Sequence, residues 1–232
     1  MKRIAIMQPY FFPYIGYFQL IQAVDQFVVY DNIKYTKKGW INRNRLLKEG
    51  EAALFSLPLK ADSDFRDIRE RELATDFSPD KFLDRIRGAY RRAPCFVETF
   101  PLIEQVVRHK DRNLFGFIHH SITATCSYLG IGTQIRISST IDVDHGLKSQ
   151  DKVLALCQAV GADTYINSIG GTDLYDQKDF AARGIELSFL QPRPIEYLQF
   201  GGEFVPWLSI IDVMMFNPKA TVVAMLDRYD LI

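Results

Sequence analysis

Residues 2–30, KRIAIMQPYFFPYIGYFQLIQAVDQFVVY, decide the fold of this chain. The pattern predicts a first strand over residues 2–7, a helix over residues 16–24 and a second strand over residues 27–30. The second strand is apolar without interruption, which is typical of a strand buried on both faces. We therefore expect a parallel, right-handed βαβ unit at the start of an α/β fold.

The remaining sequence continues this α/β pattern around a charged, helical interruption. Ser78 and Pro79 mark a helix start, and Gly161 marks a helix end. We expect a single domain over residues 1–232, built on a parallel sheet, with a helical insertion at residues 60–130. The further expected strands are residues 52–57, 134–139, 164–167 and 185–190, and the further expected helices are residues 79–92, 100–128 (with a break near Asp111 or Gly116), 149–160, 178–183, 206–216 and 218–229.

The composition excludes several classes of protein. Apolar residues make up 47% of the chain and the formal net charge is zero, so no overall charge attracts nucleic acid or an acidic membrane. Cys95, Cys126 and Cys157 are far apart and lack CxxC spacing, which argues against a disulfide framework or a zinc site. We expect a cytoplasmic protein, because free cysteines fit a reducing compartment.

The loop between the first strand and the helix is rich in aromatic residues. Pro9 and Pro13 interrupt the uncharged run, so we expect no membrane insertion. A loop this apolar suits the wall of a pocket, and α/β proteins bind ligands beyond the carboxyl ends of their strands. Packing within the core is the alternative for the tyrosines. The candidate substrate-binding residues in this segment are Gln8, Tyr10, Tyr14, Gly16 and Tyr17.

A basic stretch, residues 34–45, follows the second strand and is expected to face the same crevice. Its arginines and lysines can clamp a diphosphate, and its tryptophan can stack on a base or a sugar. The alternative is a charged loop that only faces solvent. The candidate substrate-binding residues here are Lys37, Trp40, Asn42, Arg43 and Arg45.

Candidate catalytic groups follow the second strand and the strand at residues 134–139. Asp31, Asp144 and His145 are the candidate bases, since a carboxylate or an imidazole can accept a proton near neutral pH. Asp142, Asp144 and His145 alone do not specify a metal site, so no metal is expected.

Two further loops carry candidate substrate-binding residues. Ser138 precedes a helix whose amino end can attract an anion. Gly170 and Gly171 follow a strand and allow a ligand to approach the backbone, although a tight turn explains them equally well.

The segment Tyr14-Ile15-Gly16-Tyr17 resembles the HIGH-type motif of nucleotidyltransferases and pantothenate synthetase, with both histidines replaced by tyrosine. The resemblance implies a nucleotidyltransferase-like (HUP or Rossmann-like) sheet. Tyrosine can hydrogen-bond a phosphate or a sugar but brings no positive charge, so adenylyl or cytidylyl transfer does not follow from it.

The chain as a whole resembles the WbqC-like protein family. Four blocks carry the resemblance in order: residues 8–17, residues 31–44, residues 156–165 with the following Gly170-Gly171, and residues 208–217. Members are often associated with O-antigen and other surface-polysaccharide gene clusters, which implies a role in making or decorating a sugar.

These observations lead to three functional hypotheses. The first is a transferase in cell-surface polysaccharide (O-antigen) biosynthesis that acts on a nucleotide-linked amino sugar, by N-acyl or aminoacyl transfer. The second is an ATP-dependent ligase or nucleotidyltransferase-like enzyme. The third is a non-catalytic binding or scaffold protein of a polysaccharide assembly complex. The sequence indicates no particular cofactor and leaves the oligomeric state open, a homo-oligomer included.

Overall fold

The computed structural model describes residues 1–63 and 65–232. Its centre is a six-stranded sheet in the order β5-β2-β1-β6-β7-β8. The first five of these strands are parallel, and β8 pairs with β7 in the antiparallel direction. The expected Rossmann-like α/β fold is thereby confirmed. The strand bounds are Arg3–Met7 (β1), Gln26–Val29 (β2), Gln134–Ile137 (β5), Thr164–Ser168 (β6), Glu186–Pro192 (β7) and Tyr229–Leu231 (β8).

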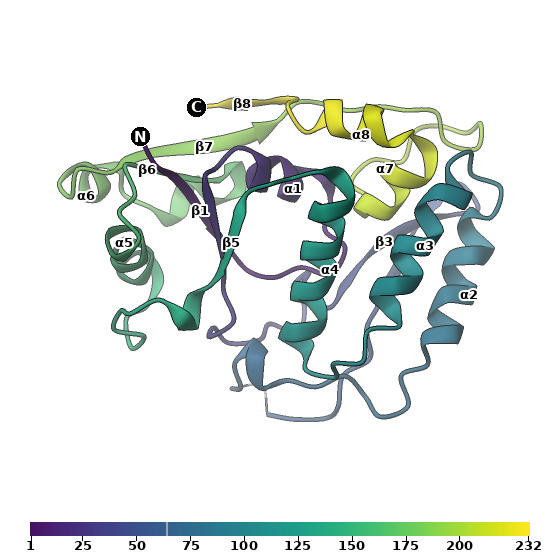
Figure 1. Cartoon of the computed structure of the whole chain (residues 1–232), viewed down its shortest axis with the longest axis horizontal. Coiled ribbons are helices and arrows are strands. Elements are labelled where there is room, and N and C mark those ends of the chain that lie inside the picture. The colour runs from purple at the N-terminus through teal and green to yellow at the C-terminus, as the bar shows by residue number, and fades with distance from the viewer. Residues whose placement is uncertain (64) are drawn as a thin grey trace.

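Helices cover both faces of this sheet (Figure 1). Strand β1 shows why, because its side chains alternate between two apolar cores. Ile4 and Ile6 pack in the core that also holds α5, whereas Ala5 packs in the core that holds α1. Apolar side chains on both faces require cover on both faces, as the uninterrupted apolar runs predict. The helices concerned are α1 (Ile15–Gln22) and α8 (Lys219–Met225) on one side, and α5 (Ser149–Ala159) and α6 (Gln177–Ala181) on the other.

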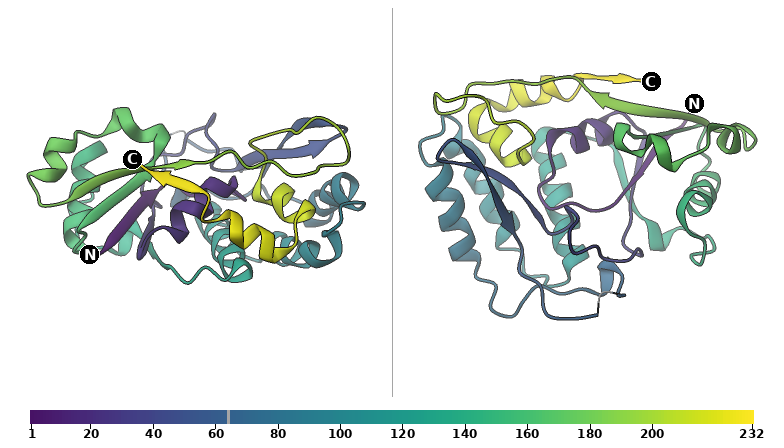
Figure 2. Two further views of the ribbon diagram at one scale, coloured as in Figure 1. Left: turned by 90° about the horizontal axis from the view of Figure 1, so that it is seen from above. Right: turned by 180° about the vertical axis from the view of Figure 1, so that it is seen from behind.

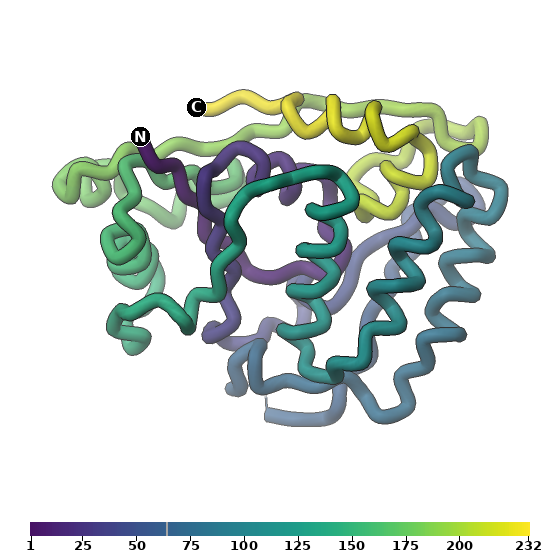
Figure 3. Tube along the Cα trace, in the orientation of Figure 1, coloured from purple at the N-terminus to yellow at the C-terminus, as the bar shows by residue number. Residues whose placement is uncertain are grey.

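A long excursion separates β2 from β5, and Figure 3 follows its course from the end of the purple segment to the teal segment. It begins with an antiparallel hairpin, β3 (Arg43–Lys48) and β4 (Glu51–Ser56), which forms a sheet of its own. The expected strand at residues 52–57 is therefore β4. It pairs with β3, a strand that the sequence pattern did not predict because its residues are rich in charge. The helices that follow are η1 (Ile68–Glu70), α2 (Pro79–Tyr90), α3 (Phe96–Val107) and α4 (Leu114–Leu129).

Helices α2, α3 and α4 lie side by side at the end of the molecule away from α5 and α6 (Figures 1 and 2). Helix α2 begins as predicted, since the Ser78 side chain accepts a hydrogen bond from the Lys81 amide and Pro79 occupies the first turn. The helix expected at residues 100–128 is two helices, with the break before Leu114. The insertion expected at residues 60–130 contains all of these helices, with residue 64 outside the described part.

The carboxyl-terminal region differs from the two long helices that the sequence predicted. It holds α7 (Ile210–Phe216), α8 and the edge strand β8. Strand β8 forms because the outer edge of β7 offers unpaired backbone groups, and residues 229–231 pair with them. Two short turns of 3-10 helix, η2 (Ser138–Thr140) and η3 (Ile169–Leu174), follow β5 and β6. Within the described residues, no helix has the length and apolar character needed to cross a membrane.

Candidate functional site

The sheet order reverses direction between β1 and β6, and a cavity of about 500 Å³ lies beyond the carboxyl ends of these strands. This reversal is the point where open α/β sheets bind ligands, because the loops leave in opposite directions. Side chains from four regions meet there: the ends of β1, β6 and β7, the beginning of α1, strand β3 with the loop before it, and the segment before α7. The aromatic members of the lining are Tyr10, Tyr14, Tyr17, Trp40 and Trp207.

The aromatic loop after β1 is divided between the core and this cavity. Phe11 and Phe12 are fully buried, whereas Tyr10, Pro13 and Tyr14 line the cavity. Phe12 has a φ angle of 41°, a conformation that side chains rarely adopt. Three elements hold it there. Its carbonyl oxygen accepts hydrogen bonds from the Asn44 amide group (2.8 Å) and the Ser209 hydroxyl (2.7 Å), and its N–H donates to the Ser121 hydroxyl (3.4 Å).

The tyrosines of this loop have different structural roles. Tyr17 is buried, and its hydroxyl donates to the Gln8 carbonyl at 2.9 Å, so it holds the loop in shape. Gln8 is thereby a partner of this tyrosine rather than a lining residue. Tyr14 is half-buried, packs its ring 5.2 Å from that of Trp207, and has no hydrogen-bond partner for its hydroxyl in the described chain. Burial raises the pKa of Tyr10, Tyr14 and Tyr17, so each remains a hydrogen-bond donor at neutral pH.

Gly16 lines the cavity, and its lack of a side chain has a packing reason as well. A Cβ atom there would lie 3.1 Å from Cγ of Pro192 and 3.3 Å from the Tyr14 ring. Glycine therefore lets the start of α1 approach the end of β7, which closes one wall of the cavity.

Arg45 is the only charged side chain in the lining of this cavity, among the described residues. Its guanidinium lies 4.8 Å from the ring of Trp40, in a cation–π contact. Its Nε atom is buried and has no hydrogen-bond partner within the described chain. A buried donor without a partner is costly, so the position of this guanidinium is maintained by other contacts, of which the stacking on Trp40 is one.

The other candidates of the basic stretch lie elsewhere. Arg43 donates from Nε to the Gly39 carbonyl at 2.8 Å and from Nη2 to the Lys38 carbonyl, so it closes its own loop. The Asn42 amide bonds the Tyr35 hydroxyl (2.8 Å) and the Leu57 carbonyl (2.7 Å), and it is buried beside the hairpin. Lys37 is also outside the cavity lining.

A second cluster of polar side chains lies at the same edge of the sheet, beyond β2 and β5. The Asp31 carboxylate accepts hydrogen bonds from the Ser138 hydroxyl (2.9 Å), the Ser139 amide (2.9 Å) and the Ser139 hydroxyl (2.5 Å). The side chain of Asp31 therefore ties the end of β2 to the segment after β5 through three hydrogen bonds. Ser138 belongs to this tie and does not line the cavity.

Asn32 and Lys152 complete the cluster, and the sequence reasoning missed both. Lys152 is only 5% exposed, and its Nζ donates to the carbonyl and the side-chain oxygen of Asn32 at 3.1 and 3.2 Å. Burial lowers the pKa of Lys152. The Asn32 side-chain nitrogen lies 2.9 Å from Nδ1 of His145, so His145 joins the cluster from an exposed loop. A lysine among the apolar positions of the helix at residues 149–160 was the available signal.

The last candidates shape turns. Asp144 accepts a hydrogen bond from the Gly146 amide at 2.8 Å and is exposed. Gly170 and Gly171 lie in η3, where a Cβ on Gly171 would come within 2.3 Å of the Asn167 amide nitrogen. Their neighbours Ser168 and Ile169 line the cavity instead. The described residues contain no group of three or more His, Cys, Asp or Glu side chains that is able to hold a metal.

Comparison with known proteins gives a family but no activity. The model of the WbqC-like protein family matches residues 8–224. The chain is also 30% identical over 224 residues to the uncharacterized protein Rv1507c of Mycobacterium tuberculosis, covering 95% of each chain. No solved structure matches it significantly.

Proposed function

The chain belongs to the WbqC-like protein family, and from that premise we propose that it binds a nucleotide-linked sugar in the cavity beyond β1 and β6. In this proposal it acts as a cytoplasmic transferase in the synthesis of a cell-surface polysaccharide, acylating or aminoacylating an amino sugar. The observation that carries the proposal is Arg45, the only charged side chain among the described residues that line an aromatic cavity, with its guanidinium 4.8 Å from the ring of Trp40.

The lining supports this class of ligand in three ways. A volume of about 500 Å³ is in the usual range for a small-molecule site. Trp40 and the tyrosines offer flat apolar faces to a base or a sugar ring. Arg45 offers the planar donor group that binds phosphate oxygens well, and the absence of acidic side chains from the described lining favours an anion.

The same lining also favours a second candidate, a non-catalytic protein that binds the same ligand. Of the described residues that line the cavity, none is Asp, Glu, His, Lys or Cys. A transferase reaction at an amino group needs a proton acceptor, and no carboxylate or imidazole of the described residues lines this cavity. Binding and turnover must therefore be tested separately.

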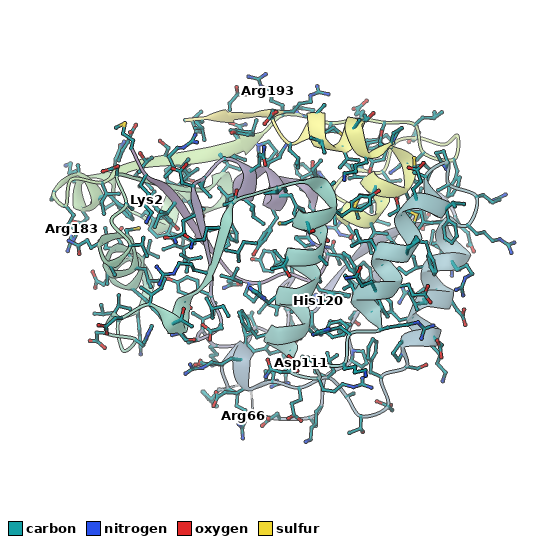
Figure 4. All side chains as sticks on the ribbon, viewed as in Figure 1. Lys2, Arg66, Asp111, His120, Arg183 and Arg193 are labelled. Carbon is teal, nitrogen blue, oxygen red and sulfur yellow. The ribbon has the colours of Figure 1, made fainter. Side chains whose placement is uncertain are left out.

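Isothermal titration calorimetry with a panel of UDP-, GDP- and dTDP-linked sugars tests binding. We expect one or more to bind, and we expect Arg45→Met to weaken that binding about tenfold or more, since a charge-assisted hydrogen bond is lost. Arg183→Met is the matched control, because Arg183 lies beside α6 at the far end of the molecule (Figure 4) and donates to the Asp179 carbonyl. The proposal fails if no nucleotide sugar binds, or if Arg45→Met binds as tightly as the wild type.

Mass spectrometry then separates the transferase from the binding protein. The nucleotide amino sugar that binds is incubated with the protein and acyl donors, namely acyl-coenzyme A, or amino acids with ATP. A new mass on the sugar supports the transferase. An unchanged sugar that still binds in an Arg45-dependent way supports the non-catalytic protein.

A further inference from the structure

A second cavity, of about 480 Å³, adjoins the first. It lies between the chain after β7, residues 192–197, and the segment before α7, residues 203–208. Tyr14, Pro192 and Trp207 line both cavities. The rings of Tyr14 and Trp207, 5.2 Å apart, therefore form the partition between them.

Trp207 is held at this boundary by its backbone. Its φ angle is 60°, which side chains other than glycine rarely adopt, and 59% of the residue is exposed. The hydrogen bonds around it are those of the next residues: Ser209 donates its amide to the Arg45 carbonyl, and Ile210 donates to the Pro13 carbonyl. The segment is thus fixed to β3 and to the aromatic loop, and Trp207 lines both cavities.

The two cavities have opposite charge. The first contains Arg45 as the only charged side chain of its described lining, whereas the second contains Arg193, Glu196 and Glu203. Arg193 projects at the outer edge of the molecule (Figure 4) and makes a two-pronged ion pair with Asp230, with Nε–O distances of 3.0 and 3.1 Å. Its charge is offset in this way.

The negative charges of Glu196 and Glu203 are not offset by a positively charged partner among the described residues. Both are exposed at the rim of the second cavity, and neither has a hydrogen bond or an ion pair with any described residue. The walls beneath them are aromatic, from Tyr197, Phe204 and Trp207. The cavity therefore combines flat apolar faces with uncompensated negative charge.

We propose that this second cavity is the subsite for an amino sugar, whose ring packs on Trp207 and whose ammonium group is bound by Glu196 and Glu203. The inference rests on the proposed function, because the anionic nucleotide part is assigned to the first cavity. The shared chemistry is a sugar ring with a protonated amine. It can come from the sugar of a nucleotide-linked ligand that reaches past Tyr14, or from a separate sugar acceptor.

The test uses matched pairs of ligands that differ only in the amine: UDP-glucosamine against UDP-N-acetylglucosamine, and glucosamine against N-acetylglucosamine. We expect the amine to be preferred about threefold to tenfold, the size expected for ion pairs open to solvent. The double variant Glu196→Gln/Glu203→Gln should lose this preference. Glu186→Gln is the matched control, since Glu186 is also exposed but begins β7 instead of following it.

The chain carries its own reporters, because it has two tryptophans and, of these, Trp207 lines the second cavity and Trp40 does not. Trp40 lines the first cavity alone, and Trp207 lines both. In ¹H–¹⁵N spectra, assigned with Trp40→Phe and Trp207→Phe, free glucosamine should shift the indole resonance of Trp207 and leave that of Trp40 in place. A preference seen only with the UDP-linked pair assigns the amine to the nucleotide-linked ligand, and a preference in the free pair assigns it to a separate acceptor.

Several results would overturn the inference: equal affinity for amine and N-acetyl ligands, a preference that survives in the double glutamine variant, or glucosamine shifts at Trp40 alone. These differ from a failure of the proposed function. If UDP-linked sugars bind through Arg45 without amine preference, only the second subsite is wrong. If no UDP-linked sugar binds but glucosamine binds through the glutamates, the amino-sugar subsite is supported and the proposed binding of a nucleotide-linked sugar is wrong.

Discussion

The side-chain nitrogen of Asn32 lies 2.9 Å from Nδ1 of His145. The oxygen of the same amide faces the Lys152 ammonium at 3.2 Å. An ammonium can only donate, so Lys152 fixes the orientation of the amide and its N–H points at the imidazole. Nδ1 of His145 must then accept, and Nε2 carries the proton. In this arrangement Nε2–H of His145 is a hydrogen-bond donor, and the role of His145 as a base remains a prediction.

Asn32→Asp should reverse this tautomer. A carboxylate can only accept a hydrogen bond, so the proton is expected to move to Nδ1 and leave Nε2 as an acceptor. Long-range ¹H–¹⁵N spectra of the imidazole rings distinguish the two forms. The rings of His109, His119 and His120 lie on or just after the helices of the excursion and serve as internal controls that should not change. A wild-type His145 with its proton already on Nδ1 would show that Lys152 does not fix the orientation of the amide.

The Phe12 carbonyl predicts non-additive effects of two substitutions. Asn44 and Ser209 both donate to this buried oxygen. Asn44→Ala or Ser209→Ala alone leaves one donor, and each should lower the free energy of unfolding by about 1–2 kcal/mol. The double variant leaves the carbonyl without either donor, so its loss should exceed the sum of the single losses by about 1 kcal/mol. Denaturant titrations measure these values. Ser209→Ala combined with Ser78→Ala is the control and should be additive, because Ser78 caps helix α2 through the Lys81 amide and has no contact with the Phe12 carbonyl.

Sequence patterns predicted the inner strands of the sheet well because β1, β2 and β6 are short and buried on both faces. The partly exposed edge strand β8 was not predicted. The aromatic loop after residues 2–7 also predicted where the cavity lies, since Tyr10, Tyr14 and Gly16 line it. Trp40 and Arg45 line it as well. The local sequence was sufficient here, because the end of the first strand fixes where the loop must lie.

Contacts between distant segments could not be predicted in the same way. Trp207 lies far from the aromatic loop in sequence. Its place beside Tyr14 depends on its positive φ angle, which the sequence pattern did not predict. Arg43, Asn42 and Asp31 have the chemistry of ligand-binding residues but bond their own chain. A sequence shows which donors and acceptors exist, and only the fold shows which of them are already occupied.

Asp212 predicts an unusual pH dependence. It is fully buried, and its carboxylate accepts hydrogen bonds from the Tyr90 hydroxyl (2.8 Å), the Tyr197 hydroxyl (2.6 Å) and the Gln199 amide (2.8 Å). Burial outweighs these bonds and raises the pKa of Asp212. An acid with a raised folded pKa contributes stability below its unfolded pKa, and this is lost as pH rises through the folded value.

We therefore expect the free energy of unfolding of the wild type, relative to Asp212→Asn, to fall as pH rises from about 4 towards neutral. Asp212→Ala should destabilise at every pH, by about 2–4 kcal/mol, because three buried donors lose their acceptor. Urea titrations across this pH range measure both. A difference between wild type and Asp212→Asn that is independent of pH would contradict the raised pKa.

His109, just after α3, and His119 and His120, within α4, lead us to expect a loss of stability in acid. The rings of His109 and His120 are stacked 4.0 Å apart. Burial, together with the neighbouring His109, lowers the pKa of His120, and burial with the neighbouring His120 lowers that of His119. A base with a lowered folded pKa leaves stability intact above its unfolded value, here 6.5, and stability is lost as pH falls through the folded pKa.

His120→Gln removes one titrating ring and the repulsion it exerts on His119. The slope of unfolding free energy against pH, measured by urea titration between about pH 7 and pH 5, should therefore be shallower in this variant. His145→Gln is the matched control, since His145 lies on an exposed loop outside this stack. An equal loss of slope in both variants would assign the acid sensitivity to histidine content in general and not to the stacked pair.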